Sequence, residues 1–176
     1  MSSTVSATDI LRDAYERIHE ELPELLGGLD SATLLWRPDP DANSIAWLAW
    51  HLTRVQDDHV AGVGEVEQVW TRDGFAGRFA LPYAVETIGY GHTSAEVGAF
   101  DVADARLLVD YHDAVHVMTM GVVETMDDSG FARVVDEDWD PPVTAAVRLV
   151  SVIGDALAHL GQIGYVRGLA ERRAGA

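Results

Sequence analysis

The pattern of apolar and polar residues predicts four long helices. Apolar residues recur at helical spacing over residues 8–26, 45–68, 102–126 and 144–170. In the first segment they are Ile10, Leu11, Ala14, Ile18, Leu22 and Leu25. Gly27 and Gly28 indicate where that segment ends, and Asn43 or Ser44 is suited to cap the second. Four such helices in one chain predict an all-α fold, a four-helix bundle.

The connections between these segments differ in length and composition. Residues 34–41 are rich in turn formers, and residues 70–93 are expected to be a long loop between the second and third helices. Thr93 to Glu96 has the form of a capping box that opens a short helical turn. The acidic residues 130–142 are expected to form a solvated loop. No linker or repeat interrupts the pattern, so we expect one domain over residues 1–176, with residues 1–8 flexible.

Composition narrows the classes of function. The formal net charge of −17 argues against nucleic acid and anionic membranes as partners, because both need a basic surface. Residues 1–8 do not have the pattern of a signal peptide, and no apolar stretch is predicted to be long enough to span a bilayer. We therefore expect a cytoplasmic protein. The chain has no cysteine, so any thiol used in its chemistry must come from outside.

A narrow polar stripe on the fourth helix is the main indication of function. On a helical wheel of about 100° per residue, apolar residues of the segment 147–166 fall on every side, whereas the polar ones share an arc about 80° wide. They are Arg148, Ser151, Asp155, His159 and Gln162. The stripe faces either water or a pocket inside the bundle. We favour the pocket, because a helix that is apolar on its other sides is usually buried, and buried ionisable groups are paired or bind metal.

Three residues of the predicted bundle are candidate metal ligands. Asp155 and His159 lie four residues apart on one helix face, so their side chains can share one ion. His51, on the second helix, is a candidate third ligand, although a lone histidine in an apolar helix is more often a core residue. Three nitrogen and oxygen ligands with an open fourth position describe a catalytic zinc site. The same set can hold iron, nickel or manganese.

Other residues near these ligands have weaker claims to a role. We expect Arg148, Gln162 and Trp47 to take part in substrate binding. His112 and His116, also four residues apart, form a rival metal-binding pair on the third helix. A packed histidine pair is the more common arrangement, and no carboxylate shares their helix face.

Three segments resemble the DinB-like proteins of actinobacteria. They are the run from Asn43 to Leu52, the run from Trp139 to Thr144, and the run from Asp155 to Gly168. These proteins belong with the metal-dependent S-transferases that use mycothiol or bacillithiol, and they are related to the N-terminal domain of the mycothiol-dependent maleylpyruvate isomerases. In that superfamily one histidine on the second helix and one on the fourth bind a divalent metal, and His51 and His159 match these positions. The residue four before the last histidine is usually histidine or glutamate in the superfamily, whereas here it is the shorter Asp155.

The resemblance implies a thiol-dependent S-transferase or isomerase. A thiol such as mycothiol would occupy the open position on zinc, lose its proton and attack a small electrophile held under the long loop. Related bundles are often dimers, so the resemblance also implies a homodimer. Two alternatives stay open at this point: a hydrolase that uses metal-bound water, and a non-catalytic bundle that binds a ligand.

Overall fold

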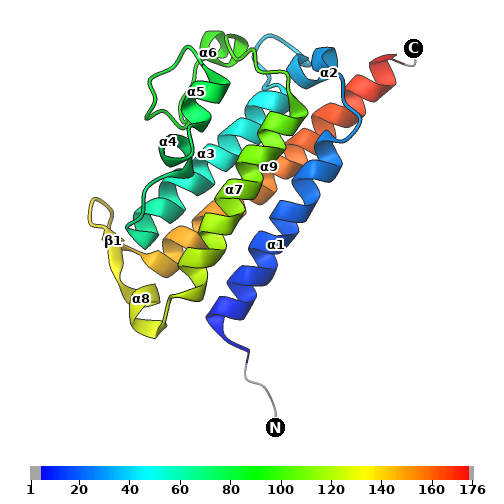
Figure 1. The fold of residues 1–176 in the computed structure, drawn as a ribbon. Coiled ribbons are helices and arrows are strands. Elements are labelled where there is room, and N and C mark those ends of the chain that lie inside the picture. Colours follow the sequence, from blue (N-terminus) through cyan, green and yellow to red (C-terminus); the bar gives the residue numbers. More distant parts are fainter. Residues whose placement is uncertain (1–4, 175–176) are drawn as a thin grey trace.

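The computed structural model describes residues 5–174 and confirms the all-α fold (Figure 1). Its four long helices are α1 (Ala7–Leu26), α3 (Ile45–Gly64), α7 (Ala105–Glu124) and α9 (Ala145–Ala174). Helix α3 packs against both α7 and α9, and α1 packs against the same two helices on the other side of the bundle. The apolar core lies between these four helices.

Side-chain caps determine where the long helices begin. Ser6 caps α1, so Ala7 and Thr8 are helical rather than flexible, while residues 1–4 lie outside the described part of the chain. Ser44, one of the two predicted residues, caps α3. Asp104 accepts hydrogen bonds from two backbone N–H groups and caps α7, which therefore starts slightly later than predicted.

Helix α3 ends at Gly64, earlier than the predicted end at Gln68. Glu65 adopts the left-handed conformation, with φ at 52°, and its backbone N–H bonds to carbonyl groups of the last turn. The chain then turns back over the bundle, and Gln68 precedes the next helix.

The connections contain more structure than the sequence pattern predicted. The long crossover holds α4 (Val69–Arg72), α5 (Phe75–Phe79) and α6 (Ser94–Gly98), and α6 opens with the predicted capping box. The first predicted loop overlaps α2 (Ser31–Leu35). The acidic connector includes part of α8 (Asp128–Ala132) and all of β1 (Val134–Asp136), which pairs antiparallel with β2 (Val143–Thr144) directly after it. Helices α2 and α6 lie at one end of the bundle, and α8 and β1 at the other (Figure 1).

Helix α9 is less enclosed than predicted. Its inward face is buried through Leu149, Val152, Ala156, Leu160 and Ile163. Its opposite face exposes apolar side chains, with Val150 at 62% and Tyr165 at 68%. The prediction of a helix buried on its apolar sides is therefore wrong. The polar stripe follows the boundary between the two faces, where Arg148, Asp155 and His159 are half-buried.

The same helix corrects the prediction about membrane spans. Residues Ala145–Arg173 have a mean hydropathy of 1.3 and meet the length and composition of a membrane-spanning helix. A core helix of a bundle meets the same test, and α9 packs against both α1 and α3. Packing accounts for the apolar residues on its inward face, while Val150 and Tyr165 on the opposite face stay exposed.

Candidate metal centre

Helices α3 and α9 bring the three predicted ligands together. His51 lies near the start of α3, and Asp155 and His159 lie on successive turns of α9. One ligand atom from each side chain lies within 4.8 Å of the other two. The imidazole rings of His51 and His159 meet edge to face, with centroids 4.8 Å apart. Within residues 5–174, this is the one group of three such side chains that the fold assembles.

Hydrogen bonds determine which ring nitrogen each histidine can offer. His51 Nδ1 bonds to the backbone carbonyl of Ile88, and His159 Nδ1 bonds to the amide oxygen of Gln162 at 2.9 Å. Because these oxygens can only accept, both Nδ1 atoms carry the proton. The Nε2 atom of neutral His51 is left with its lone pair, and His159 Nε2 offers one when it carries no proton shared with Asp155. A metal-ligating histidine is typically held in this way, with its other nitrogen donating to a carbonyl.

Asp155 supplies the third, negatively charged group. Its Oδ1 lies 3.5 Å from His159 Nε2, and its Oδ2 is buried with no hydrogen-bond partner. The hydrogen bond with His159 lowers the pKa of Asp155 and outweighs the effect of burial, so the side chain is a carboxylate near neutral pH. An unpartnered carboxylate oxygen beside two imidazole lone pairs fits a divalent cation.

The two histidines differ in their affinity for protons. Burial lowers the pKa of His51, and its bond to Ile88 only partly offsets that effect. Burial also lowers the pKa of His159, but the hydrogen bonds with Asp155 and Gln162 outweigh it, and the pKa is raised overall. Protons therefore compete with metal mainly at His159 Nε2.

The loop before α6 closes over His51. Gly89 has φ at +90°, and a Cβ atom on it would lie 2.8 Å from His51 Nδ1 and 2.9 Å from Trp50. Only glycine permits this close approach and this backbone conformation together. Trp47 stacks on the imidazole of His51, with ring centroids 4.7 Å apart, and is 5% exposed. The structure thus places Trp47 in the core as a support for His51.

A pocket of about 170 Å³ opens beside the three ligands. Its lining residues include His51 and Asp155 together with Val55, His59, Ile88, Tyr90, Arg148, Ser151 and Val152. Arg148, predicted to bind substrate, therefore faces this pocket, while its Nη2 pairs with Asp136 at 2.6 Å. His59 was not singled out from the sequence. It lies near the metal ligands only because α3 packs against α9.

Gln162 lies on the other side of the three ligands. Besides bonding to His159, it lines a groove of about 420 Å³ beside the C-terminal half of α9. Of the residues predicted to bind substrate, Arg148 and Gln162 thus border two different hollows, with the ligands between them.

The rival pair His112 and His116 does not form an equivalent site. His19 of α1 stacks on His116 with nearly parallel rings, at 4.0 Å between centroids and 9° between planes. Parallel rings direct their lone pairs side by side rather than toward one point. His112 Nδ1 bonds to Thr53, and within the described residues no set of three ligand atoms converges here. The cluster is a packed contact between α1 and α7.

Comparisons with known proteins agree with this geometry. A family model of the DinB superfamily matches residues 14–163, which include all three ligands. The chain belongs to the DinB superfamily. This DinB-superfamily chain is also similar to a solved structure, that of a conserved protein from Enterococcus faecalis. The two share 32% identity, with 95% of this chain and 98% of the other covered and a TM-score of 0.88. No curated protein matches the chain.

Proposed function

We propose that this DinB-superfamily protein is a zinc-dependent S-transferase that joins an external low-molecular-weight thiol to a small electrophile. The observation that carries the metal site is the arrangement of His51 and His159. Each ring has its Nδ1 held by a carbonyl oxygen, which leaves Nε2 as the nitrogen that can bind metal, and Asp155 lies 3.5 Å from His159 Nε2 with its second oxygen unpartnered. Three ligands leave zinc an open position, as in catalytic zinc sites. The chain's lack of cysteine agrees with a thiol supplied from outside.

Each part of the site has a role in this proposal. His51, Asp155 and His159 hold the cation, which when bound lowers the pKa of a neighbouring thiol. Ile88 and Gln162 fix the two imidazole rings through their oxygens. The pocket beside Asp155, of about 170 Å³, has room for a small molecule.

We infer that the thiol is mycothiol and that the protein acts in the cytoplasm. The first inference follows from the resemblance to the actinobacterial DinB-like proteins, and the second from the acidic composition of the chain. The net charge of −17 supports a role without nucleic acid or anionic membranes, because both would be repelled. Arg148 at the pocket offers one local positive charge in this acidic chain.

Thermal unfolding in the presence of thiols tests the proposal. We expect mycothiol to raise the Tm of the zinc-loaded protein and to leave the Tm of the metal-free protein unchanged. S-methylated mycothiol, which has no ionisable sulfur, is the matched control and should give no shift. A zinc-loaded protein that responds to neither mycothiol nor bacillithiol contradicts the S-transferase and favours the hydrolase.

A further inference from the structure

The pocket beside the metal ligands contains one side chain suited to exchange a proton with a bound molecule. The ionisable residues that line it are His51, His59, Tyr90, Arg148 and Asp155. His51 and Asp155 are ligands, and an arginine has no lone pair to accept a proton. The side chain of Tyr90 is 89% exposed and lies largely in solvent. His59 is therefore the lining residue that can both accept and return a proton near neutrality.

The position of His59 fits this use. It lines both the pocket beside the ligands and a neighbouring hollow of about 360 Å³. Its Nδ1 is 3.4 Å from Asp58 Oδ2, and Asp58 borders only the second hollow. With Nδ1 turned to the carboxylate, Nε2 is the nitrogen that remains for the pocket. A carboxylate on Nδ1 of a histidine favours the tautomer whose Nε2 can accept a proton.

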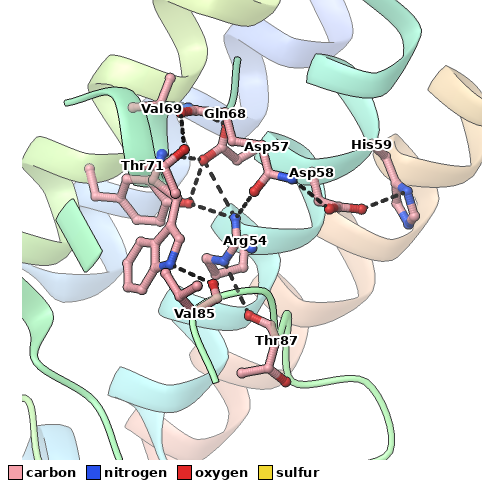
Figure 2. Close-up of polar contacts among 11 residues, drawn as sticks. Arg54, Asp57, Asp58, His59, Gln68, Val69, Thr71, Val85 and Thr87 are labelled. Carbon is pink, nitrogen blue, oxygen red and sulfur yellow. Dashed lines mark hydrogen bonds and ion pairs between the residues drawn. The ribbon is translucent and has the colours of Figure 1, made fainter. Parts of the chain in front are cut away.

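Asp58 is itself held in place by a buried network. Figure 2 follows the contacts from Arg54 through Gln68 and Asp58 to His59. Arg54 is fully buried and donates to Gln68 Oε1 at 3.1 Å. Because arginine only donates, the bond turns the amide nitrogen of Gln68 toward Asp58 Oδ1, at 2.8 Å. Asp58 Oδ2 is then left for His59.

The base of this network is rigid. Arg54 also contacts Tyr111 and lies over the ring of Trp70, 5.1 Å from its centroid. Asp57 accepts the hydroxyl of Tyr111 and the backbone N–H groups of Val69 and Trp70. The partners of Asp58 are therefore fixed by the core rather than by solvent, which orients His59 through a chain of contacts.

Four charged groups on three elements act on His59. They are Asp58 on α3, Arg148 and Asp155 on α9, and Asp136 on β1. Burial lowers the pKa of His59 most, and Arg148 adds to this, while the three carboxylates oppose it. The imidazole is therefore neutral near pH 7 in the free protein, which is the form that accepts a proton.

We propose that His59 is the proton acceptor and donor of the reaction, a role that rests on the proposed function. The S–H proton of the incoming thiol passes to His59 Nε2. The sulfur electron pair then forms the bond to the electrophile, while the bond between the electrophile and its leaving group breaks. The leaving group takes the proton from His59 and restores the neutral imidazole. The thiol and the electrophile become a thioether and the protonated leaving group, with no oxidant or reductant.

Proton counting on the zinc-loaded full chain tests this role without measuring activity. N-acetylcysteine is titrated into the protein at pH 7 by calorimetry, in two buffers of different ionisation enthalpy, which gives the number of protons released per thiol bound. We expect wild type to release well under one proton, because the negative charge of the bound thiolate raises the pKa of His59 above its value in the free protein and His59 retains the proton. His59→Gln should release about one proton per thiol, since the thiolate forms and no side chain keeps the proton. His19→Gln is the matched control, since His19 is also paired with an aspartate, Asp113, but lies between α1 and α7.

The outcomes separate the two proposals. If wild type and His59→Gln bind the thiol and release equal numbers of protons, His59 is not the acceptor, while the S-transferase stands. If wild type binds no thiol, the proposed function fails and the role of His59 fails with it. If His59→Gln loses zinc or unfolds, the role of His59 is tested on wild type alone, by NMR of the His59 ring proton. The His59 ring proton must then shift to its charged position on addition of thiol at pH 7, and an unchanged signal overturns the role.

Discussion

His159 bonds through Nδ1 to the side-chain oxygen of Gln162, one turn further along α9, and this bond leaves its Nε2 beside Asp155. The ligand and the residue that orients it therefore lie on the same face of one helix. Replacing Gln162 by leucine keeps the helix and the size of the side chain but removes the acceptor. We expect zinc affinity to fall about 10–100-fold, as for other residues that orient metal-bound histidines. Competition with a chromogenic chelator measures this, and an unchanged affinity would show that the bond has no role in metal binding.

A substitution at Gly89, which is not a metal ligand, is expected to weaken the metal site by displacing His51. A Cβ at this position would meet His51 and Trp50, whereas a Cβ on Gly91 has no atom within 4 Å, although Gly91 also has positive φ, at 73°. Alanine at either position should cost about 1–2 kcal/mol in stability, because both residues are left-handed. Only Gly89→Ala should also weaken zinc binding, since it displaces His51. Urea unfolding and zinc titration of the two variants measure the effects, and equal zinc affinities would contradict the close packing over His51.

The histidine cluster between α1 and α7 predicts a loss of stability at acidic pH. Burial, together with the neighbouring His19 and His116, lowers the pKa of His112 from 6.5 to about 3. Below pH 6.5 the unfolded chain takes up a proton at this position and the folded chain does not, so stability falls as the pH falls from 6.5 toward 3. The slope contributed by His112 is on the order of 1.4 kcal/mol per pH unit within this window. Above pH 6.5 His112 contributes no pH dependence.

His112→Asn isolates this contribution. Asparagine can keep a polar contact with Thr53 but does not titrate, so the variant should lose stability less steeply between pH 7 and pH 5 than wild type does. Urea unfolding at both pH values gives the two slopes. Identical slopes would assign the acid sensitivity to other groups.

Replacing Asp57, in the buried part of the network, is expected to lower the stability of the protein strongly. It is fully buried and accepts hydrogen bonds from Tyr111 and from the first two backbone N–H groups of α4. Asp57→Asn places an amide N–H against those donors and leaves the buried Arg54 without its carboxylate. We expect a loss of about 3–5 kcal/mol. Asp58→Asn, one residue on and half-buried, should cost about 1 kcal/mol or less, and similar losses for both variants in urea unfolding would argue against the network as a buried ion pair.

The sequence predicted the four long helices well, because their apolar spacing is local. It also named the three side chains that the fold brings together: Asp155 and His159 share a face through their separation of four residues, and His51 was the candidate on another helix, a position that the resemblance also matched. The exposure of Val150 and Tyr165 was not predictable, because apolar composition alone does not show which face of α9 meets other helices.

The contacts that complete the site were also out of reach of sequence patterns. Ile88 contributes a backbone carbonyl, which any residue type carries, so no side-chain motif marks it. His59 reaches the pocket because α3 and α9 run side by side, and the Asp58 carboxylate 3.4 Å from its Nδ1 is held by Gln68, which Arg54 orients. These relationships depend on tertiary structure.

The metal content of the purified chain tests the central claim most directly. Untagged wild type, equilibrated with zinc and freed of excess metal, should retain about one zinc ion per chain, as expected for a single three-ligand site. His51→Ala, Asp155→Ala and His159→Ala should each lose most of it, whereas His116→Ala, which alters the packed cluster, should retain it. Elemental analysis by mass spectrometry gives the stoichiometry. Wild-type zinc content in His51→Ala and His159→Ala, or its loss in His116→Ala, would contradict the assignment of the metal to helices α3 and α9.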